Sequence, residues 1–83
     1  MISVVVCAKN EESRIELCLK SILQNNFSEI IVIDGDSNDR TVEIAKNFTS
    51  NIIISKSKSL TVDRQIGIDA ANNSLIAMID ADH

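Results

Sequence analysis

Aromatic and basic residues are scarce in this sequence. Phe27 and Phe48 are the only aromatic residues, so the chain offers no platform on which the bases of single-stranded nucleic acid could stack. Lys and Arg number 8 against 12 Asp and Glu, which gives a net charge of −4, and they form no basic stripe. This balance argues against a protein dedicated to binding phosphate backbones. We therefore expect no nucleic-acid partner.

The sequence also has few cysteines and no long apolar run. Cys7 lies in a short apolar run and Cys18 in a helical pattern, without the CxxC spacing of a zinc site. We predict that both are reduced core residues, and a reactive thiol is the minor alternative. No stretch approaches the roughly 20 apolar residues that a membrane span needs, and the first residues lack the positive charge of a signal peptide. We expect a cytoplasmic protein, and peripheral membrane contact stays open.

What the sequence does contain is typical of one small folded domain. Apolar residues make up 45% and charged residues 24% of the 83 residues, which is ordinary for a globular protein. Internal repeats, low-complexity tracts and linkers are absent from the sequence. Because a chain of this length supports only one modest core, we predict a single domain over residues 1–83.

Four short apolar runs predict buried β-strands. They are rich in β-branched residues, and they are too short and too uniformly apolar for surface helices. The runs are ISVVVCA at 2–8, EIIVID at 29–34, NIIIS at 51–55 and SLIAMID at 74–80.

Three segments with helical periodicity separate these strands. The first carries an apolar stripe from Ile15 to Leu23, and we expect Asn10 to be its N-cap. Asp39 and Thr61 are the expected caps of the second and third helices. The apolar faces of these two helices are expected to hold Val42, Ala45 and Phe48, and Val62, Ile66 and Ala70, respectively.

Strands that alternate with helices predict an α/β fold with helices on both faces of a parallel sheet, a three-layer α/β/α architecture. Ligands of such sheets bind beyond the carboxyl ends of the strands. Three polar segments follow strand ends, namely CAKNEE at 7–12, DGDSND at 34–39 and DADH at 80–83. We expect these segments to meet at one edge of the sheet.

The last polar segment has the residue types of a metal site. In an extended stretch, residues i and i+2 point the same way, so Asp80 and Asp82 would project together, and the small Ala81 would leave a ligand room to approach. Hard divalent cations such as Mg²⁺ or Mn²⁺ prefer carboxylate oxygens. The alternative is a solvated acidic turn after a buried strand.

Four segments in this order resemble the N-terminal, nucleotide-binding half of family 2 glycosyltransferases with the GT-A fold. They are VVVCAKNEE at 4–12, IIVIDGDSNDRT at 30–41, DRQIGIDAA at 63–71 and IAMIDADH at 76–83, the last of which corresponds to the family's DxD element. The resemblance implies a mostly parallel four-stranded sheet of order 3-2-1-4. It also implies a nucleotide-diphospho-sugar donor, expected to be a UDP-sugar, and Mn²⁺ or Mg²⁺ as cofactor.

The resemblance assigns roles to residues of a nucleoside pocket. Ala8 and Asn10 would border this pocket, and Glu12 would lie close to the base or ribose. Asp34 would accept a hydrogen bond from the base, typically uracil, and Arg64 would meet the base or the diphosphate. Other interpretations stay open, because Asp34 can brace the following turn, Glu12 can face a helix dipole and Arg64 can be a surface charge.

The resemblance assigns further roles near the end of the chain. Asp80 and Asp82 would hold the ribose and the metal, and His83, at a position that is often Asp, would complete the metal shell or contact phosphate. Gly67 would allow close packing of its helix. Gly35 stands where many relatives carry a second Asp, which leaves uridine specificity open.

These features favour a glycosyltransferase, represented by its donor-binding half. In the family, the general base and the acceptor pocket lie beyond the DxD element, so the resemblance implies no catalytic residue in this chain and no sugar transfer by it alone. The alternatives are a non-catalytic nucleotide-sugar-binding module, or a fragment that needs a partner or a missing C-terminal half. A phosphoacceptor receiver domain is a weaker alternative, because its acidic pair should follow the first strand, where this chain has Cys7, Ala8 and Lys9.

The implied strand order places residues 74–80 at an edge of the sheet, beside the strand at 2–8. An exposed apolar edge strand invites pairing with another chain. We therefore expect self-association, as a homodimer or an aggregate, through this strand.

Overall fold

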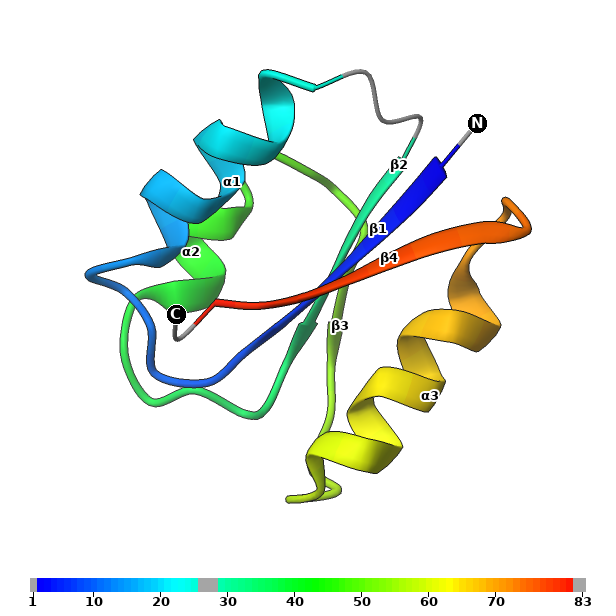
Figure 1. Ribbon diagram of the computed structural model, residues 1–83. Helices are drawn as coiled ribbons and strands as arrows, with labels where there is room; N and C mark the ends of the chain where they lie inside the picture. The colour runs from blue at the N-terminus through cyan, green and yellow to red at the C-terminus, as the bar shows by residue number, and fades with distance from the viewer. Residues whose placement is uncertain (1, 26–28, 82–83) are drawn as a thin grey trace.

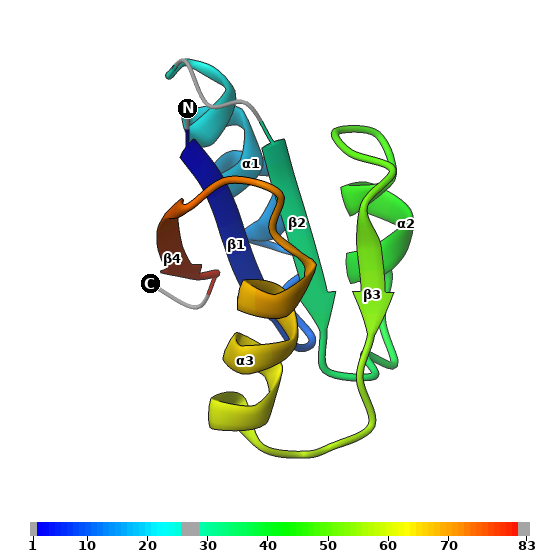
Figure 2. The same cartoon turned by 90° about the vertical axis from the view of Figure 1, so that its right-hand side faces the viewer.

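A parallel sheet with helices on both faces forms the molecule in the computed structural model, which describes residues 2–25 and 29–81 (Figure 1). The strands lie in the order β3-β2-β1-β4, and each neighbouring pair is parallel. Helices α1 and α2 cover one face and α3 covers the other (Figure 1 and Figure 2). The predicted architecture and strand order are confirmed. The elements are β1 (Ile2–Ala8), α1 (Ile15–Leu23), β2 (Glu29–Asp34), α2 (Thr41–Ala45), β3 (Ile52–Ile54), α3 (Leu60–Ala70) and β4 (Leu75–Asp80).

The core consists of two apolar clusters, one on each face of the sheet. Side chains of the central strand β1 alternate between them, because successive residues of a strand point to opposite faces. On one face, Val4 and Val6 belong to the same cluster as Ile15 and Leu19 of α1. Burial of β1 and β2 on both faces explains their uninterrupted β-branched sequences. The cluster on the other face contains Val5, Cys7, Ile31 and Ile33.

Helix α3 approaches the sheet closely at a glycine. A Cβ atom added to Gly67 would lie 2.2 Å from Cγ1 of Val5 in β1, so a larger residue does not fit without a shift of the backbone or of Val5. The expected role of Gly67 is therefore confirmed. Asp63 and Gly67 are the buried residues of α3, whereas Val62 is 46% exposed. The prediction that Val62 faces the core was wrong, because the helix turns the side that carries Gly67 toward the sheet.

Two of the predicted helix caps were wrong. The N-cap of α1 is Arg14 rather than Asn10, which has a φ of 51° and bonds to the loop after β2. Ser59 rather than Thr61 caps α3, and its hydroxyl accepts a hydrogen bond from the N–H of Val62 at 3.3 Å. A capping residue stands just before the first helical turn, and Thr61 already lies within that turn.

Asp39, the predicted cap of α2, makes a capping hydrogen bond but does not occupy the N-cap position. Oδ1 of Asp39 accepts a hydrogen bond from the N–H of Thr41 at 3.0 Å, whereas Arg40 occupies the N-cap position. The helix is short and ends at Ala45. Phe48, which was expected on its apolar face, follows the helix and is partly buried against the core.

Both cysteines are free and contribute to the core, as predicted. Cys7 is buried, and Cys18, a residue of α1, is partly buried against the core. None of the helices in the described parts of the chain has the length and apolar character that a membrane crossing requires.

Candidate functional site

The loops that follow β1 and β2 are joined at the carboxyl edge of the sheet. The N–H of Gly35 donates to the carbonyl oxygen of Ala8 at 2.8 Å. Asn10 adds two bonds, because its N–H donates to Oγ of Ser37 and its Oδ1 accepts from the N–H of Asn38, both at 2.8 Å. The left-handed φ of 51° at Asn10 turns the chain into this position. The predicted meeting of polar segments is confirmed for these two loops.

Glu12 also connects the loop after β1 to the segment after β2, and it does not belong to a helix. Its N–H donates to Oδ2 of Asp39 at 3.2 Å, and its Oε2 accepts from the N–H of Arg40 at 3.4 Å. The N–H of Glu11 donates to Oγ1 of Thr41 at 2.8 Å. Hydrogen bonds to Asp39, first of all that from the Thr41 hydroxyl, hold the pKa of Asp39 below its ordinary value. A charged Asp39 therefore fixes the start of α2 against the loop after β1.

Asp34, at the end of β2, is buried and braces the turn that follows. Its exposed fraction is 1%. Its Oδ2 accepts from the N–H of Ser37 at 2.8 Å, and its Oδ1 accepts from the hydroxyl of the same serine. Its carbonyl oxygen accepts from the N–H of Ser55 at 2.7 Å, which ties in the segment after β3. The structure shows the turn-bracing role that the sequence left open, and base binding by Asp34 stays a prediction.

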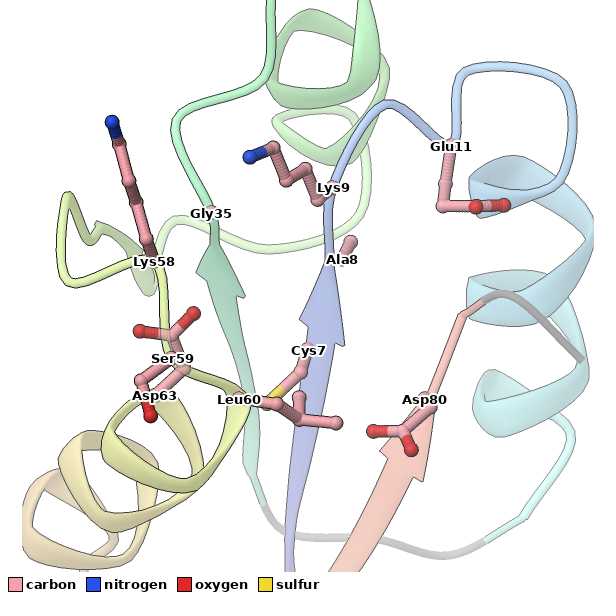
Figure 3. Close-up of a pocket in the computed structure, with 10 residues that line it drawn as sticks. All are labelled: Cys7, Ala8, Lys9, Glu11, Gly35, Lys58, Ser59, Leu60, Asp63 and Asp80. Atoms are coloured by element: carbon pink, nitrogen blue, oxygen red, sulfur yellow. The ribbon is translucent and has the colours of Figure 1, made fainter.

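An open pocket of about 200 Å³ lies at this edge of the sheet, between the ends of β1, β2 and β4 and the start of α3 (Figure 3). Ala8 and Asp80 are the predicted site residues that line it. Much of the remaining wall comes from the β3–α3 connection and the first turn of α3. The predicted residues that do not line the pocket are Asn10, Glu12, Asp34 and Arg64.

Asp80 faces the pocket from the end of β4 and is paired with Arg64 of α3. In the sheet, Asp80 lies opposite Cys7 of β1. Nη2 of Arg64 donates to Oδ2 of Asp80 at 2.7 Å, and the two side chains are 43% and 21% exposed, respectively. Arg64 is therefore not simply a solvated helix charge. It connects α3 to β4 and holds one of the two oxygens of the Asp80 carboxylate.

The sequence did not indicate Asp63, because a charged residue on a helix is normally solvated. In the structure Asp63 lines the pocket, is 7% exposed, and accepts a hydrogen bond at Oδ1 from the hydroxyl of Ser57 at 2.7 Å. A signal was present in the helical spacing of one face, which comprises Asp63, Ile66, Gly67 and Ala70. That face packs on β1 and β2, and its first residue reaches the pocket.

Cys7 lines the pocket as a protonated thiol. Burial, followed by the negative charges of Asp80 and Asp63, raises the pKa of Cys7 to about 11, and the charge of Arg64 opposes this shift. A thiol with such a pKa is not a thiolate nucleophile at neutral pH. The core role predicted for Cys7 therefore agrees with the structure better than the reactive alternative.

The predicted metal ligands lie only partly within the described residues. Asp82 and His83 lie outside them. Oδ1 of Asp80 has no hydrogen bond within the described part of the chain, and a carboxylate oxygen is the kind of ligand that Mg²⁺ or Mn²⁺ prefers. Over residues 2–25 and 29–81, no group of three or more His, Cys, Asp or Glu side chains is placed to hold a metal ion. Asp80 thus fits the chemistry of a divalent cation as one ligand of several.

Comparison with known proteins decides the family. A family model described as "Glycosyl transferase family 2" matches residues 3–83. The chain belongs to glycosyl transferase family 2. A similar member is the 4,4'-diaponeurosporenoate glycosyltransferase of Staphylococcus haemolyticus, which is 48% identical over 52 residues that cover 61% of this chain and 14% of the relative. An uncharacterized glycosyltransferase of Rickettsia typhi is 33% identical over 81 residues that cover 98% of this chain and 27% of the relative. The family 2 chain thus spans 14% and 27% of the length of these two relatives.

Solved structures agree with the family assignment. Glucosyl-3-phosphoglycerate synthase from Mycobacterium tuberculosis, in complex with Mg²⁺ and UDP, superimposes with a TM-score of 0.80 at 26% identity, covering 99% of this chain and 33% of that one. TarS from S. aureus gives a TM-score of 0.81 at 26% identity, covering 98% of this chain and 27% of that one. Together with the strand order, these neighbours show that the fold is the N-terminal part of the GT-A fold.

Proposed function

We propose that this chain forms the donor-binding part of an enzyme that transfers a sugar from a UDP-sugar to a hydroxyl group of an acceptor. The observation that carries the proposal is the pocket at the carboxyl edge of the sheet, where Ala8 of β1 and Asp80 of β4 share one cavity in a family 2 fold. Parallel sheets bind their ligands at this edge. Further support comes from glucosyl-3-phosphoglycerate synthase, which was crystallised with Mg²⁺ and UDP and also with Mn²⁺ and UDP-glucose.

In this proposal, residues on different elements contact different parts of the donor. Ala8 borders the nucleoside and leaves it room, because its side chain is a single methyl group. Asp80 binds the ribose through Oδ1, the oxygen that Arg64 does not hold. The guanidinium of Arg64 lies beside Asp80 and supplies the positive charge that suits a diphosphate.

The proposal keeps Asn10, Glu12 and Asp34 as residues of the nucleoside site. The hydrogen bonds of Asn10 and Glu12 join the loops after β1 and β2, so these residues act on the base and ribose through the position of the loops. Asp34 accepts a hydrogen bond from a base only if a bond from Ser37 is exchanged for it.

We assign Mn²⁺ or Mg²⁺ to Asp80, Asp82 and His83. A divalent cation supplies stabilisation of the negative charge that builds on the departing diphosphate. Asp80 presents one carboxylate oxygen to the pocket, while Arg64 competes for the other. The positive charge of Arg64 therefore competes with the divalent cation for the carboxylate of Asp80.

No residue of this chain is proposed as the general base, and we expect no sugar transfer by the chain alone. The pocket volume of about 200 Å³ lies below the range of roughly 300–1,000 Å³ that is common for ligand sites, which fits a site completed by further protein. The same observation favours a second candidate, a nucleotide-sugar-binding module that has no activity without a partner. Turnover of a UDP-sugar to a simple acceptor by these 83 residues would contradict the expected inactivity of the chain alone, and it would also contradict the second candidate.

We also propose that the protein acts in the cytoplasm. Cys7 and Cys18 are free thiols, as is usual for proteins of a reducing compartment. We assign no acceptor, because the pocket residues discussed above are proposed to contact the donor alone.

Titration calorimetry with UDP, in the presence and absence of Mn²⁺, tests the proposed function. We expect the folded chain to bind UDP only with the metal, and Asp82→Ala to bind it at least about tenfold more weakly, as expected for a lost interaction of about 1.4 kcal/mol or more. Asp69→Ala is the matched control, because Asp69 is exposed on α3 and bonds to Gln65. A folded chain that binds no nucleoside diphosphate with Mn²⁺ or Mg²⁺ would overturn the proposal.

A further inference from the structure

Two carboxylates face the pocket from opposite sides. Figure 3 shows Asp63 and Ser59 on one side of Cys7 and Asp80 on the other, with the side chain of Leu60 overlapping Cys7 in this view. Both negative charges act on the pocket, because each adds to burial in raising the pKa of the Cys7 thiol. Asp63 belongs to α3 and Asp80 to β4, so the two groups are placed to contact different parts of one ligand.

One oxygen of Asp63 is held in place and the other is free to accept a hydrogen bond. Oδ1 accepts from the hydroxyl of Ser57, whose oxygen in turn accepts from the N–H of Ser59 at 3.1 Å. Oδ2 has no hydrogen-bond partner among the described residues. Within the same residues, no side-chain nitrogen or oxygen is both buried and without a partner. Oδ2 therefore reaches accessible space, and the pocket is a space that Asp63 lines.

Asp34 offers no such oxygen. Both of its carboxylate oxygens accept hydrogen bonds from Ser37, and it does not line the pocket. Gly35, the next residue, lines the pocket but has no side chain. The end of β2 thus presents no carboxylate to the pocket, whereas Asp63 presents one from α3.

Leu60 adds an apolar surface to the wall of the pocket. It lies at the start of α3, about one helical turn before Asp63, and it is 47% exposed. A ligand that satisfies both side chains has a flat ring to cover Leu60 and an N–H group at the edge of the ring to meet Asp63. A nucleobase has these two features. A sugar ring is not flat and carries no N–H group.

We propose that Asp63, in place of Asp34, selects the nucleobase: its Oδ2 accepts a hydrogen bond from a ring N–H, and Leu60 packs against the ring. The inference rests on the proposed function, because it takes a nucleoside diphosphate as the ligand of the pocket. Uracil carries the required N–H at N3. A binding site that is built to accept a hydrogen bond discriminates strongly against an analogue that lacks the donor.

UDP and its N3-methylated derivative separate this role from a merely structural one. In the presence of Mn²⁺, we expect the wild-type chain to bind the methylated ligand at least about tenfold more weakly than UDP, since a hydrogen bond to a charged group is lost. Asp63→Ala should bind the two ligands within about threefold of each other, because it removes the acceptor and makes room for the methyl group. Its affinity for inorganic pyrophosphate with Mn²⁺ should be that of the wild type. A structural role for Asp63 would instead weaken every ligand alike.

The variants are chosen so that the outcome is decided even if one of them does not fold. In Asp63→Ala, the hydroxyl of Ser57 still has the carbonyl oxygen of Ser59 as an acceptor at 3.2 Å. Asp63→Asn keeps an acceptor for Ser57 and turns an N–H donor toward the ligand, so its affinity for UDP should fall by about tenfold or more. Asp69→Asn makes the same change at an exposed position of α3 and should leave UDP binding unchanged.

Failure of this inference and failure of the proposed function give different results. If the wild-type chain binds neither UDP nor its methylated derivative, the proposed function fails, and the role of Asp63 fails with it. If the wild-type chain binds both ligands equally well, or if Asp63→Asn binds UDP as tightly as the wild type, only the role of Asp63 is overturned.

Discussion

At the scale of single residues, the partner of each carboxylate decides what that carboxylate can do. Both oxygens of Asp34 accept from one serine, so Asp34 braces a turn. Asp80 shares one oxygen with Arg64 and keeps the other for the pocket. Glu29 lies at the start of β2, at the opposite end of the strands from the pocket. It accepts hydrogen bonds from the hydroxyl of Ser3 at 2.7 Å and from the N–H of Asn72 at 2.8 Å, and so it joins β1, β2 and the segment before β4.

We expect Arg64→Gln to change the binding of metal and of nucleotide in opposite directions. Without the guanidinium, Asp80 loses a competing cation, so Mn²⁺ alone should bind up to about fivefold more tightly, which corresponds to a partly exposed ion pair of about 1 kcal/mol or less. UDP with Mn²⁺ should bind about tenfold more weakly, because a positive charge near the diphosphate is lost. Electron paramagnetic resonance of free Mn²⁺ and calorimetry measure the two affinities.

The control for Arg64→Gln is Lys20→Gln, which breaks an exposed ion pair with Glu16 on α1. This variant should leave both affinities unchanged. A parallel loss of metal and nucleotide binding in Arg64→Gln would show that Arg64 only stabilises the fold.

Glu29 should make the stability of the chain depend on pH. Hydrogen bonds, first from the N–H of Asn72 and then from Ser3, hold the pKa of Glu29 below its ordinary value. A carboxylate whose pKa is lowered in the folded state adds stability above its unfolded pKa of about 4.3 and loses this contribution as the pH falls through the folded pKa. Urea unfolding from about pH 6 to about pH 3 should therefore show a smaller loss of stability for Glu29→Gln than for the wild type. Glu16→Gln, at an exposed position of α1, should follow the wild type, and identical profiles for Glu29→Gln and the wild type would contradict the role of Glu29.

At the scale of elements, the packing of α3 on β1 depends on the missing side chain of Gly67. Gly67→Ala should lower the free energy of unfolding by about 1–3 kcal/mol, because the new methyl group would lie 2.2 Å from Cγ1 of Val5. Urea unfolding followed by circular dichroism measures the change. In Gly35→Ala, the nearest atom to the new methyl group is Cβ of Lys9 at 3.3 Å, so the change should stay within about 1 kcal/mol. Equal stability of the two variants would show that the close approach of α3 is not required.

The outer side of β4 should promote self-association. Within the described residues, β4 pairs with β1 alone, and Leu75 is 62% exposed. We expect the chain to form dimers or aggregates through this edge, and Leu75→Lys to reduce them, because a charge on an edge strand opposes pairing. Leu17→Lys is the control, since Leu17 is 72% exposed on α1, which is not part of the sheet. A wild-type chain that sediments as a monomer at high concentration would contradict this expectation.

The strands could be predicted from the sequence more accurately than the helix starts. β1 and β2 begin and end at the predicted residues, because strands that are buried on both faces have uninterrupted apolar sequences. β3 and β4 are shorter than the predicted 51–55 and 74–80. Asn10 and Thr61 are good caps by residue type, but Asn10 bonds across to another loop, which local sequence does not reveal.

The location of the candidate site could be predicted from the sequence, but not all of the side chains that line it. Asp80 was predicted because it stands at a strand end on the ligand-binding edge, and Ala8 because of the resemblance to family 2 glycosyltransferases. Asp63 was missed because its burial depends on how α3 is rotated on the sheet, and contact between Gly67 and Val5 sets that rotation. Contacts of this kind join distant parts of the chain, so the periodicity of the sequence indicates them only weakly.

At the scale of the whole molecule, the sheet brings together loops that are far apart in the chain. The N–H of Gly35 bonds to Ala8, and the N–H of Ala81 bonds to the carbonyl oxygen of Cys7 at 3.1 Å, so the ends of β1, β2 and β4 are held side by side. A donor nucleotide in the pocket would extend from Asp63 on α3 to the end of β4. We propose that the nucleotide binds at this edge of the sheet, where the strands end, and not at the opposite edge.

Amide chemical-shift mapping with UDP and Mg²⁺ tests this claim most directly. We predict that the largest shift changes occur at the amides of the carboxyl edge, with Ala8, Gly35 and Leu60 among them, and that Ser3 and Asn72 at the opposite edge change little. Shift changes concentrated around Ser3 and Asn72, or no changes at a UDP concentration that saturates a related family 2 enzyme, would contradict the assignment of the pocket as a donor site.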